Sequence, residues 1–272
     1  MAKGLKKLVH LFAVAGLAWG GPAPLLAADP VKWSATWAEG ACSARGSTPL
    51  GPEMLLSITP GNGISILSLT GKGLGLITAR QVERLELLLQ PSGPVPAMPN
   101  YLSSRYPEGP SLSFMSEDRS FLEEVAGSTK ILVRNGKKTL FEIASPDAAA
   151  AVVALRECER EGLRLHGIDP ESWRVLRSVP RLTVPPFKLV RAQDYPEAAA
   201  ASGRSGTVIV RLSVDRSGKP VKCDFIARSG TESLDQVTCE IFMERARFDP
   251  AIDRAGMPTA APFVAKLSWR TG

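Results

Sequence analysis

The four cysteines constrain this chain more than any other feature, because two disulfides would fix which segments pack together. They stand at Cys42, Cys158, Cys223 and Cys239 of a 272-residue chain. Four cysteines allow three pairings, and sequence alone does not select among them. Their positions favour Cys42–Cys158 and Cys223–Cys239, since each pair then lies within its own block of sequence. Whether the cysteines pair at all depends on the compartment in which the protein folds.

The amino terminus indicates export to an oxidising compartment. Three lysines within residues 1–7 precede a mostly apolar run over residues 8–19, and small residues lead up to Ala28. This pattern is typical of a secretory signal peptide, so residues 1–28 are predicted to be removed after Ala28. The alternative is a retained membrane anchor, but residues 8–19 are shorter than the roughly 20 residues that span a bilayer. Export therefore favours disulfides.

Charge and composition argue against several classes of function. The formal net charge is +6, and removal of the three leader lysines leaves +3. The charges are interspersed with no basic stripe, so no nucleic-acid partner is expected. No CxxC pair is present, so neither a metal nor another cofactor is expected. His166 is the one histidine after the leader; we expect it to be solvated, and we predict no catalytic residues and no enzyme activity.

Residues 29–160 are predicted to form a β-rich α+β domain closed by Cys42–Cys158. Apolar runs on both sides of Pro60–Gly63 indicate a hairpin, and Cys42 is expected in a loop after the first strand. Residues 91–110, rich in Pro, Gly and Ser, are expected to form a long loop.

Two further elements complete this first block. Asn135–Gly136 between short apolar runs indicates a second hairpin. Residues 146–158 have the apolar spacing of a helix that ends at Cys158. A connector containing several prolines is predicted over residues 161–186, and a second domain over residues 187–272.

The second domain shows the pattern of a small α+β unit. Pro196 and Gly203 bracket four alanines, as expected of a short helix. Apolar residues alternate on both sides of a turn at residues 215–218, which indicates a hairpin. Ser233 and Gln236 have the spacing of a capping box that would open a second helix. A last strand is expected up to Trp269.

The order and spacing of residues in this second domain resemble the C-terminal domain of the TonB family of energy transducers. The resemblance runs from Tyr195 to Trp269 and implies two helices on a three-stranded antiparallel sheet. It also implies that the last strand is an exposed edge that accepts a short extended peptide from outer-membrane transporters. The first block resembles no family that we recognise. The residues that carry the resemblance are Tyr195, Pro196, Gly206, Val208, Gly218, Leu234, Asp235, Arg247, Phe248 and Pro250.

The chain departs from the full pattern of a transducer in three ways. Its leader is predicted to be cleavable, it lacks the family's Ser/His membrane motif, and a connector of residues 161–186 stands where transducers carry a long Pro-rich span. The sequence therefore favours an exported periplasmic protein whose TonB-like domain binds a protein or peptide of the cell envelope. The alternatives are a transducer anchored in the inner membrane by a retained leader, and an exported enzyme or inhibitor that works through the first block.

The predicted peptide-binding edge is the strand ending at Trp269. Lys266 is the only charged residue between Pro262 and Trp269, so charge and proline protect this edge little. The alternative is that the first block covers the edge. Dimerisation is also compatible with the sequence. The residues predicted to form the edge are Ala265, Lys266, Leu267, Ser268 and Trp269.

Overall fold

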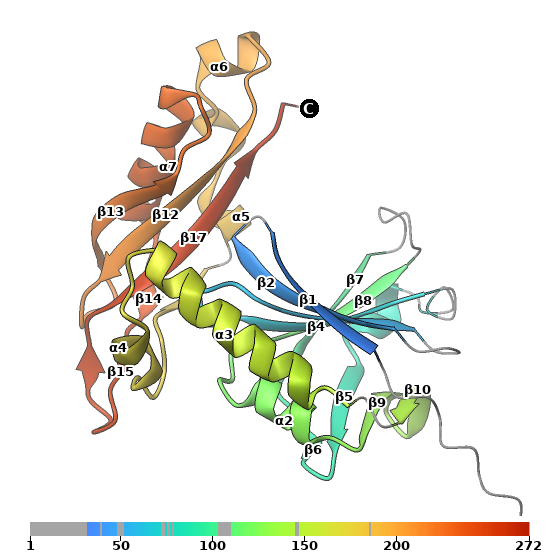
Figure 1. The fold of residues 1–272 in the computed structure, drawn as a ribbon. Coiled ribbons are helices and arrows are strands. Elements are labelled where there is room, and N and C mark those ends of the chain that lie inside the picture. Colours follow the sequence, from blue (N-terminus) through green and yellow to red (C-terminus); the bar gives the residue numbers. More distant parts are fainter. Residues whose placement is uncertain are drawn as a thin grey trace, which may run out of the picture.

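The computed structural model has an α+β fold in which antiparallel sheets carry most of the core (Figure 1). The predicted signal peptide, residues 1–28, lies outside the part of the chain that the structure describes. The described residues are 32–38, 40–47, 52–71, 74, 77, 79–102, 110–144, 147–184 and 186–271.

The first sheet of the N-terminal region is antiparallel and has six strands. Fully buried and partly buried side chains alternate along its central strands, as expected for a sheet with one face in the core. In spatial order its strands are β1 (Lys32–Ala38), β2 (Ala41–Ser47), β3 (Glu53–Ile58), β4 (Ser65–Thr70), β8 (Ser111–Ser116) and β7 (Met98–Leu102).

The second sheet lies beside the first, and three helices accompany the two sheets. Helix α3 packs on β1 and β2 and against α2, and its apolar stripe closes the core. The strands of the second sheet are β10 (Lys138–Ala144), β9 (Lys130–Asn135), β5 (Leu85–Gln90) and β6 (Gly93–Pro94). The helices are α1 (Ala79–Val82), α2 (Phe121–Gly127) and α3 (Ala149–Leu165).

Both predicted hairpins of this region are confirmed, but two predicted loops are wrong. Cys42 lies in β2, because a tight turn ending at Gly40 (φ +79°) returns the chain at once into a second strand. The segment 91–110 contains β7, which tolerates Pro99 because it forms an edge of its sheet.

Helix α3 is longer than predicted, and its end positions the rest of the chain. It continues past Cys158 to Leu165, where Leu163 extends the buried stripe. Gly167 (φ +66°) then adopts the left-handed conformation that commonly terminates helices. Asp169 caps the next helix, α4 (Pro170–Arg174), through its carboxylate, which accepts hydrogen bonds from two backbone N–H groups.

Both disulfides join the cysteines that the sequence predicts. Cys42–Cys158 links β2 to α3 across 116 residues, and Cys42 is fully buried in the core. Cys223–Cys239 links a strand to the helix that covers it, across 16 residues. Each bridge therefore fastens a helix to a sheet within one part of the chain.

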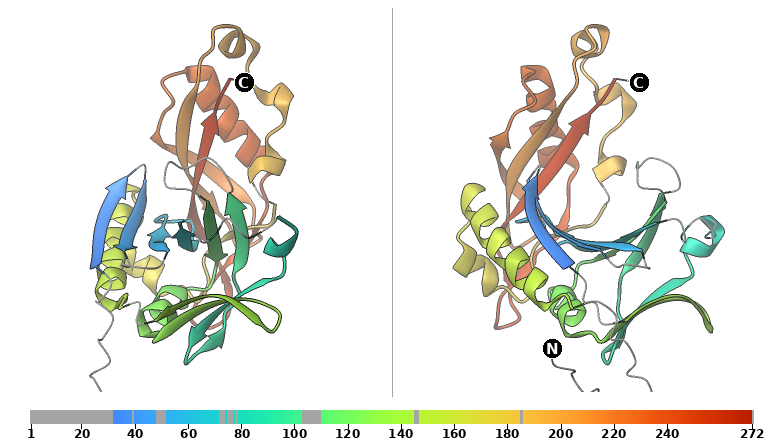
Figure 2. Two further views of the ribbon diagram at one scale, coloured as in Figure 1. Left: turned by 90° about the vertical axis from the view of Figure 1, so that its right-hand side faces the viewer. Right: turned by 45° about the vertical axis from the view of Figure 1, so that its right-hand side comes forward.

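The C-terminal part has a three-stranded antiparallel sheet in the order β13–β12–β17, as predicted (Figures 1 and 2). Helix α7 packs on one face of this sheet. The sheet strands are β12 (Gly206–Val214), β13 (Pro220–Ala227) and β17 (Ala261–Trp269). The helices are α5 (Pro186–Leu189), η2 (Ala192–Asp194), α6 (Glu197–Ala201) and α7 (Glu232–Arg245). Short strand pairs are β11 (Arg181–Leu182) with β14 (Phe248–Asp249), and β15 (Ala251–Ile252) with β16 (Pro258–Thr259).

The predicted capping box of α7 is wrong. The helix begins at Glu232 after Thr231, so Ser233 and Gln236 lie inside it. The turn before it is closed by a different residue: the Asp235 carboxylate accepts hydrogen bonds at 2.8 Å from both the backbone N–H and the hydroxyl of Ser229. This side chain from within the helix draws the preceding turn inward, and the helix starts earlier.

Candidate functional site

Strand β17 forms one edge of the C-terminal sheet. It pairs with β12 along its full length, from Ala261 opposite Val214 to Trp269 opposite Gly206, without a bulge. In the sheets formed by the described residues, β12 is the only strand paired with β17. Residues 265–269 therefore belong to a strand at the edge of this sheet.

The backbone N–H and C=O groups of β17 point alternately toward β12 and away from the sheet. The Val264 N–H donates a 2.8 Å hydrogen bond to the Gly61 carbonyl, which belongs to the turn between β3 and β4 and lies beyond the edge. In an antiparallel ladder both backbone groups of a residue point to the same side, and the side alternates along the strand. Lys266 and Ser268 therefore direct their backbone groups outward, as Val264 does.

The side chains of the predicted edge residues divide between the two faces of the sheet. Ala265 and Trp269 are buried in the α7-covered core, and Leu267 packs against it. Lys266 and Ser268 are exposed, and the Ser268 hydroxyl lies 3.0 Å from the Thr207 hydroxyl on β12. The side chains of three of the five residues thus hold the strand in place, and those of the other two are exposed to solvent.

The end of β17 is anchored by Trp269. Its indole Nε1 donates to the buried Thr238 hydroxyl of α7 at 2.9 Å. The Tyr195 ring meets the indole edge to face, with 5.3 Å between centroids. A fixed strand of this kind offers its outer edge without first having to become ordered.

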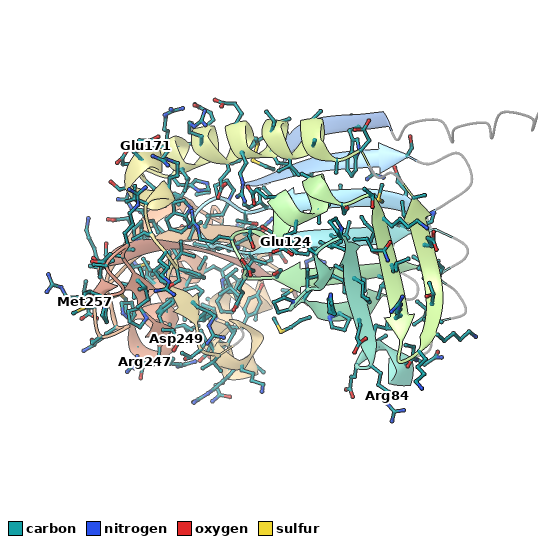
Figure 3. All side chains as sticks on the ribbon, turned by 90° about the horizontal axis from the view of Figure 1, so that it is seen from below. Arg84, Glu124, Glu171, Arg247, Asp249 and Met257 are labelled. Carbon is teal, nitrogen blue, oxygen red and sulfur yellow. A yellow bond between two sulfur atoms is a disulfide. The ribbon has the colours of Figure 1, made fainter. Side chains whose placement is uncertain are left out.

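The residues that carry the TonB resemblance are structural in this fold. Gly218 (φ +79°) brings the β12–β13 turn against the Phe248 backbone, whose N–H donates to the Gly218 carbonyl at 2.9 Å. Gly206 packs closely on Ser229, and the Val208 and Leu234 side chains are fully buried. The others lie at bends: Pro196 precedes α6, Asp235 closes the turn before α7, and Arg247 and Pro250 flank β14. Figure 3 shows Arg247 and Asp249 together on this part of the molecule, far from Arg84.

The N-terminal region contacts the start of β17, which was the alternative weighed for this edge. Val264 packs in a small apolar cluster with Leu163, Ile168, Trp173 and Val179 from the end of α3 and the connector. Val264 is the fourth residue of β17 and pairs with Arg211 of β12, so this contact lies in the first half of the strand. The edge is therefore covered at Val264.

His166 is buried rather than solvated as predicted. It is 5% exposed, and its Nδ1 lies 3.1 Å from the Pro60 carbonyl of the turn that contacts β17. The Arg211 guanidinium donates to the backbone carbonyls of His166 and Gly167, at 3.1 and 2.7 Å. Burial lowers the pKa of the His166 imidazole below its ordinary value, and the hydrogen bond with Pro60 opposes this shift.

Stability is expected to fall with acidification because of His166. A lowered pKa means that the unfolded chain binds the proton more readily, so this contribution is complete above about pH 6.5 and decreases below it. The slope for one proton is at most about 1.4 kcal/mol per pH unit. His166→Gln keeps an N–H donor for Pro60 but does not titrate. Urea unfolding of both proteins between pH 5 and 7.5 should show the parent losing stability relative to the variant. A difference that stays constant with pH would contradict this assignment.

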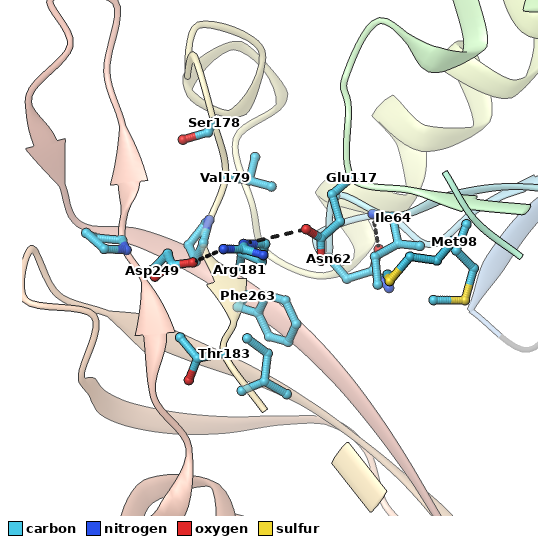
Figure 4. A pocket seen from close by; sticks show the side chains of 15 residues that line it. Asn62, Ile64, Met98, Glu117, Ser178, Val179, Arg181, Thr183, Asp249 and Phe263 are labelled. Carbon is cyan, nitrogen blue, oxygen red and sulfur yellow. Dashed lines mark hydrogen bonds and ion pairs between the residues drawn. The ribbon is translucent and has the colours of Figure 1, made fainter. Parts of the chain in front are cut away.

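A cleft of about 460 Å³ lies between the N-terminal sheets, the connector and the start of β17. Met98 and Phe263 contribute apolar walls, and Arg181 lies across the cleft (Figure 4). The Arg181 guanidinium pairs with Glu117 of the N-terminal region at 3.5 Å and with Asp249 of β14. The sequence did not predict this cleft, because the segments that form it are far apart in the chain and local patterns do not show that they meet.

Comparison with protein families identifies the C-terminal part. Residues 191–271 match the family described as Gram-negative bacterial TonB protein C-terminal. The searches of curated proteins and of solved structures found no match. Among the described residues, no helix combines the length and apolar character needed to cross a membrane. The N-terminal region is unassigned, and the resemblance inferred for residues 195–269 is confirmed: residues 191–271 of this chain form a TonB C-terminal domain.

Proposed function

We propose that this protein binds an extended segment of a cell-envelope protein by strand addition to β17. The observation that carries the proposal is that a TonB C-terminal domain ends in a fixed strand at the edge of its sheet. An edge strand presents outward N–H and C=O groups that an extended peptide can pair with. The TonB C-terminal domain is a non-catalytic, protein-interaction module, and the partner class that it suggests is an outer-membrane transporter.

The arrangement of β17 favours recognition through the backbone. Ala265, Leu267 and Trp269 are committed to the core, so they cannot supply side-chain pockets for a partner. The backbone of Ser268 faces outward, and its exposed side chain is small. Backbone pairing with β17 would then provide the affinity. Side chains at alternate positions of the paired strands would provide the preference for one peptide sequence over another.

The TonB domain and the two disulfides indicate a protein of the cell envelope. We propose that residues 1–28 are a signal peptide removed after Ala28 and that the mature protein works in the periplasm, and the intact mass of the exported protein would test this. The alternative is a retained leader, which would make the protein an anchored transducer. Both versions use the same edge strand.

Ser268→Pro is expected to weaken peptide binding about tenfold or more. Proline removes the outward N–H, and its ring obstructs the approach of an added strand. The bonds to β12 come from the neighbouring residues, so the fold should persist, as proline is tolerated on edge strands. The probes are fluorescent synthetic peptides that cover the periplasm-facing segments of outer-membrane transporters from the same organism. Binding is measured by fluorescence anisotropy.

Ser268→Ala is the matched control, because it removes the hydroxyl but keeps the N–H. It should bind the same peptides within about twofold of the parent. Circular dichroism verifies that both variants fold. Equal binding by the parent and a folded Ser268→Pro variant would rule out strand addition at this edge.

A further inference from the structure

We propose that the turn from Pro60 to Asn62 fixes one end of the added strand by occupying the first outward N–H of β17, that of Val264. The inference rests on the proposed strand addition and concerns which segments that edge accepts. The Val264 N–H donates to the Gly61 carbonyl at 2.8 Å. This is the type of bond that an incoming strand would form with an outward residue. The turn thus takes the place of a partner's backbone at Val264.

Local contacts hold the turn firmly on the edge. A Cβ placed on Gly61 (φ +91°) would lie 2.4 Å from a Val264 methyl and 3.0 Å from Ile168, so only glycine allows this approach. The Pro60 carbonyl lies 3.1 Å from the buried His166 ring. The Asn62 N–H donates to the Thr59 carbonyl at 3.2 Å, and its side chain accepts from the Ile64 N–H at 2.9 Å. These bonds keep the turn in one conformation.

The position of the turn limits the length of segment that can pair with β17. Beyond Val264 the strand continues through residues 265–269, about 17 Å of extended chain. A segment that continued in the same direction past Val264 would collide with Gly61. The edge therefore accepts a short segment of about five residues whose chain ends, or turns away from the sheet, opposite Val264. In this way the N-terminal region contributes specificity to a site on the C-terminal domain.

Gly61→Ala tests this arrangement. The added methyl group has no room against Val264, and alanine is strained at this φ, so the turn should withdraw from the edge. Gly93→Ala is the matched control, since Gly93 has φ +97° but no atom within 4 Å of its added Cβ. Hydrogen exchange should show the Val264 amide exchanging at least tenfold faster in Gly61→Ala than in the parent or in Gly93→Ala.

The binding measurement uses a peptide that binds the parent but binds Ser268→Pro more weakly in the strand-addition test. It is compared with two longer forms, extended by four residues at the amino end or at the carboxyl end. In the parent and in Gly93→Ala neither extension should improve affinity. In Gly61→Ala one of the two extensions should improve it by fivefold or more, because the strand can then continue past Val264.

The outcomes separate this inference from the proposed function. A gain of fivefold or more from an extension in the parent protein would overturn the inference while leaving strand addition in place. An unchanged hydrogen-exchange rate of the Val264 amide in Gly61→Ala would also overturn the inference. Faster exchange of this amide in Gly61→Ala without a gain in affinity from either extension would overturn it as well. If no peptide binds the parent in a Ser268-dependent way, the proposed function fails and this inference fails with it.

Discussion

Replacing Cys42 and Cys158 together with alanine is expected to lower the free energy of unfolding by about 4–5 kcal/mol. The bridge spans 116 residues, and closing a loop of that size removes much of the conformational freedom of the unfolded chain. It also ties α3 to β2 at the centre of the N-terminal core, where Cys42 is fully buried. Urea unfolding followed by circular dichroism measures the loss, and thiol titration of the parent verifies that the bridge is present.

Replacing Cys223 and Cys239 with alanine is the matched control for loop length. This bridge spans 16 residues, so its loss should cost less, about 3 kcal/mol. Both double variants remove one disulfide and two sulfur atoms. If the short-loop variant loses as much stability as the long-loop variant, loop length does not explain the contribution of the first bridge.

Gly218→Ala is expected to destabilise the C-terminal domain by about 2–5 kcal/mol. At φ +79° an L side chain is strained, and the added Cβ would lie 1.8 Å from the Phe248 carbonyl oxygen. That oxygen belongs to the backbone, so it cannot rotate away as a side chain could. The β12–β13 turn or the β14 segment must move, and the hydrogen bond from the Phe248 N–H to Gly218 would break. Thermal and urea unfolding measure the effect.

Gly230→Ala separates backbone strain from crowding. Gly230 has a similar conformation, φ +83°, but its added Cβ meets no atom within 4 Å. It should therefore lose only the roughly 1–2 kcal/mol expected from the left-handed conformation. Equal losses in the two variants would show that the close contact with Phe248 contributes nothing.

Sequence patterns predicted the C-terminal domain well because its determinants are local. Apolar alternation along residues 206–214 and 220–227 specifies two strands, and the turn between them contains Gly218. Cys223 and Cys239 fall on the strand and on the helix that must cover it, so export and spacing together predicted their pairing. Residue spacing in this part of the chain directly reflects packing.

The contacts between the two parts of the chain could not be predicted in this way. His166 was expected to be solvated because it was assigned to the connector, and a lone histidine in a loop is usually exposed. Its burial arises from Pro60, 106 residues earlier in the chain. The same holds for Gly61, whose turn was predicted but whose bond to Val264 was not. Local periodicity carries no information about which distant surfaces meet.

The two disulfides also determine what proteolysis can detach. A single cut anywhere between Cys42 and Cys158 leaves both fragments in one covalent molecule, because the bridge encloses the cut. The same protection covers the segment from Cys223 to Cys239. Strand β17 begins at Ala261, outside both rings. One cut between Cys239 and Ala261 would leave this strand attached only by hydrogen bonds and packing, so neither ring gives covalent protection to the proposed binding element.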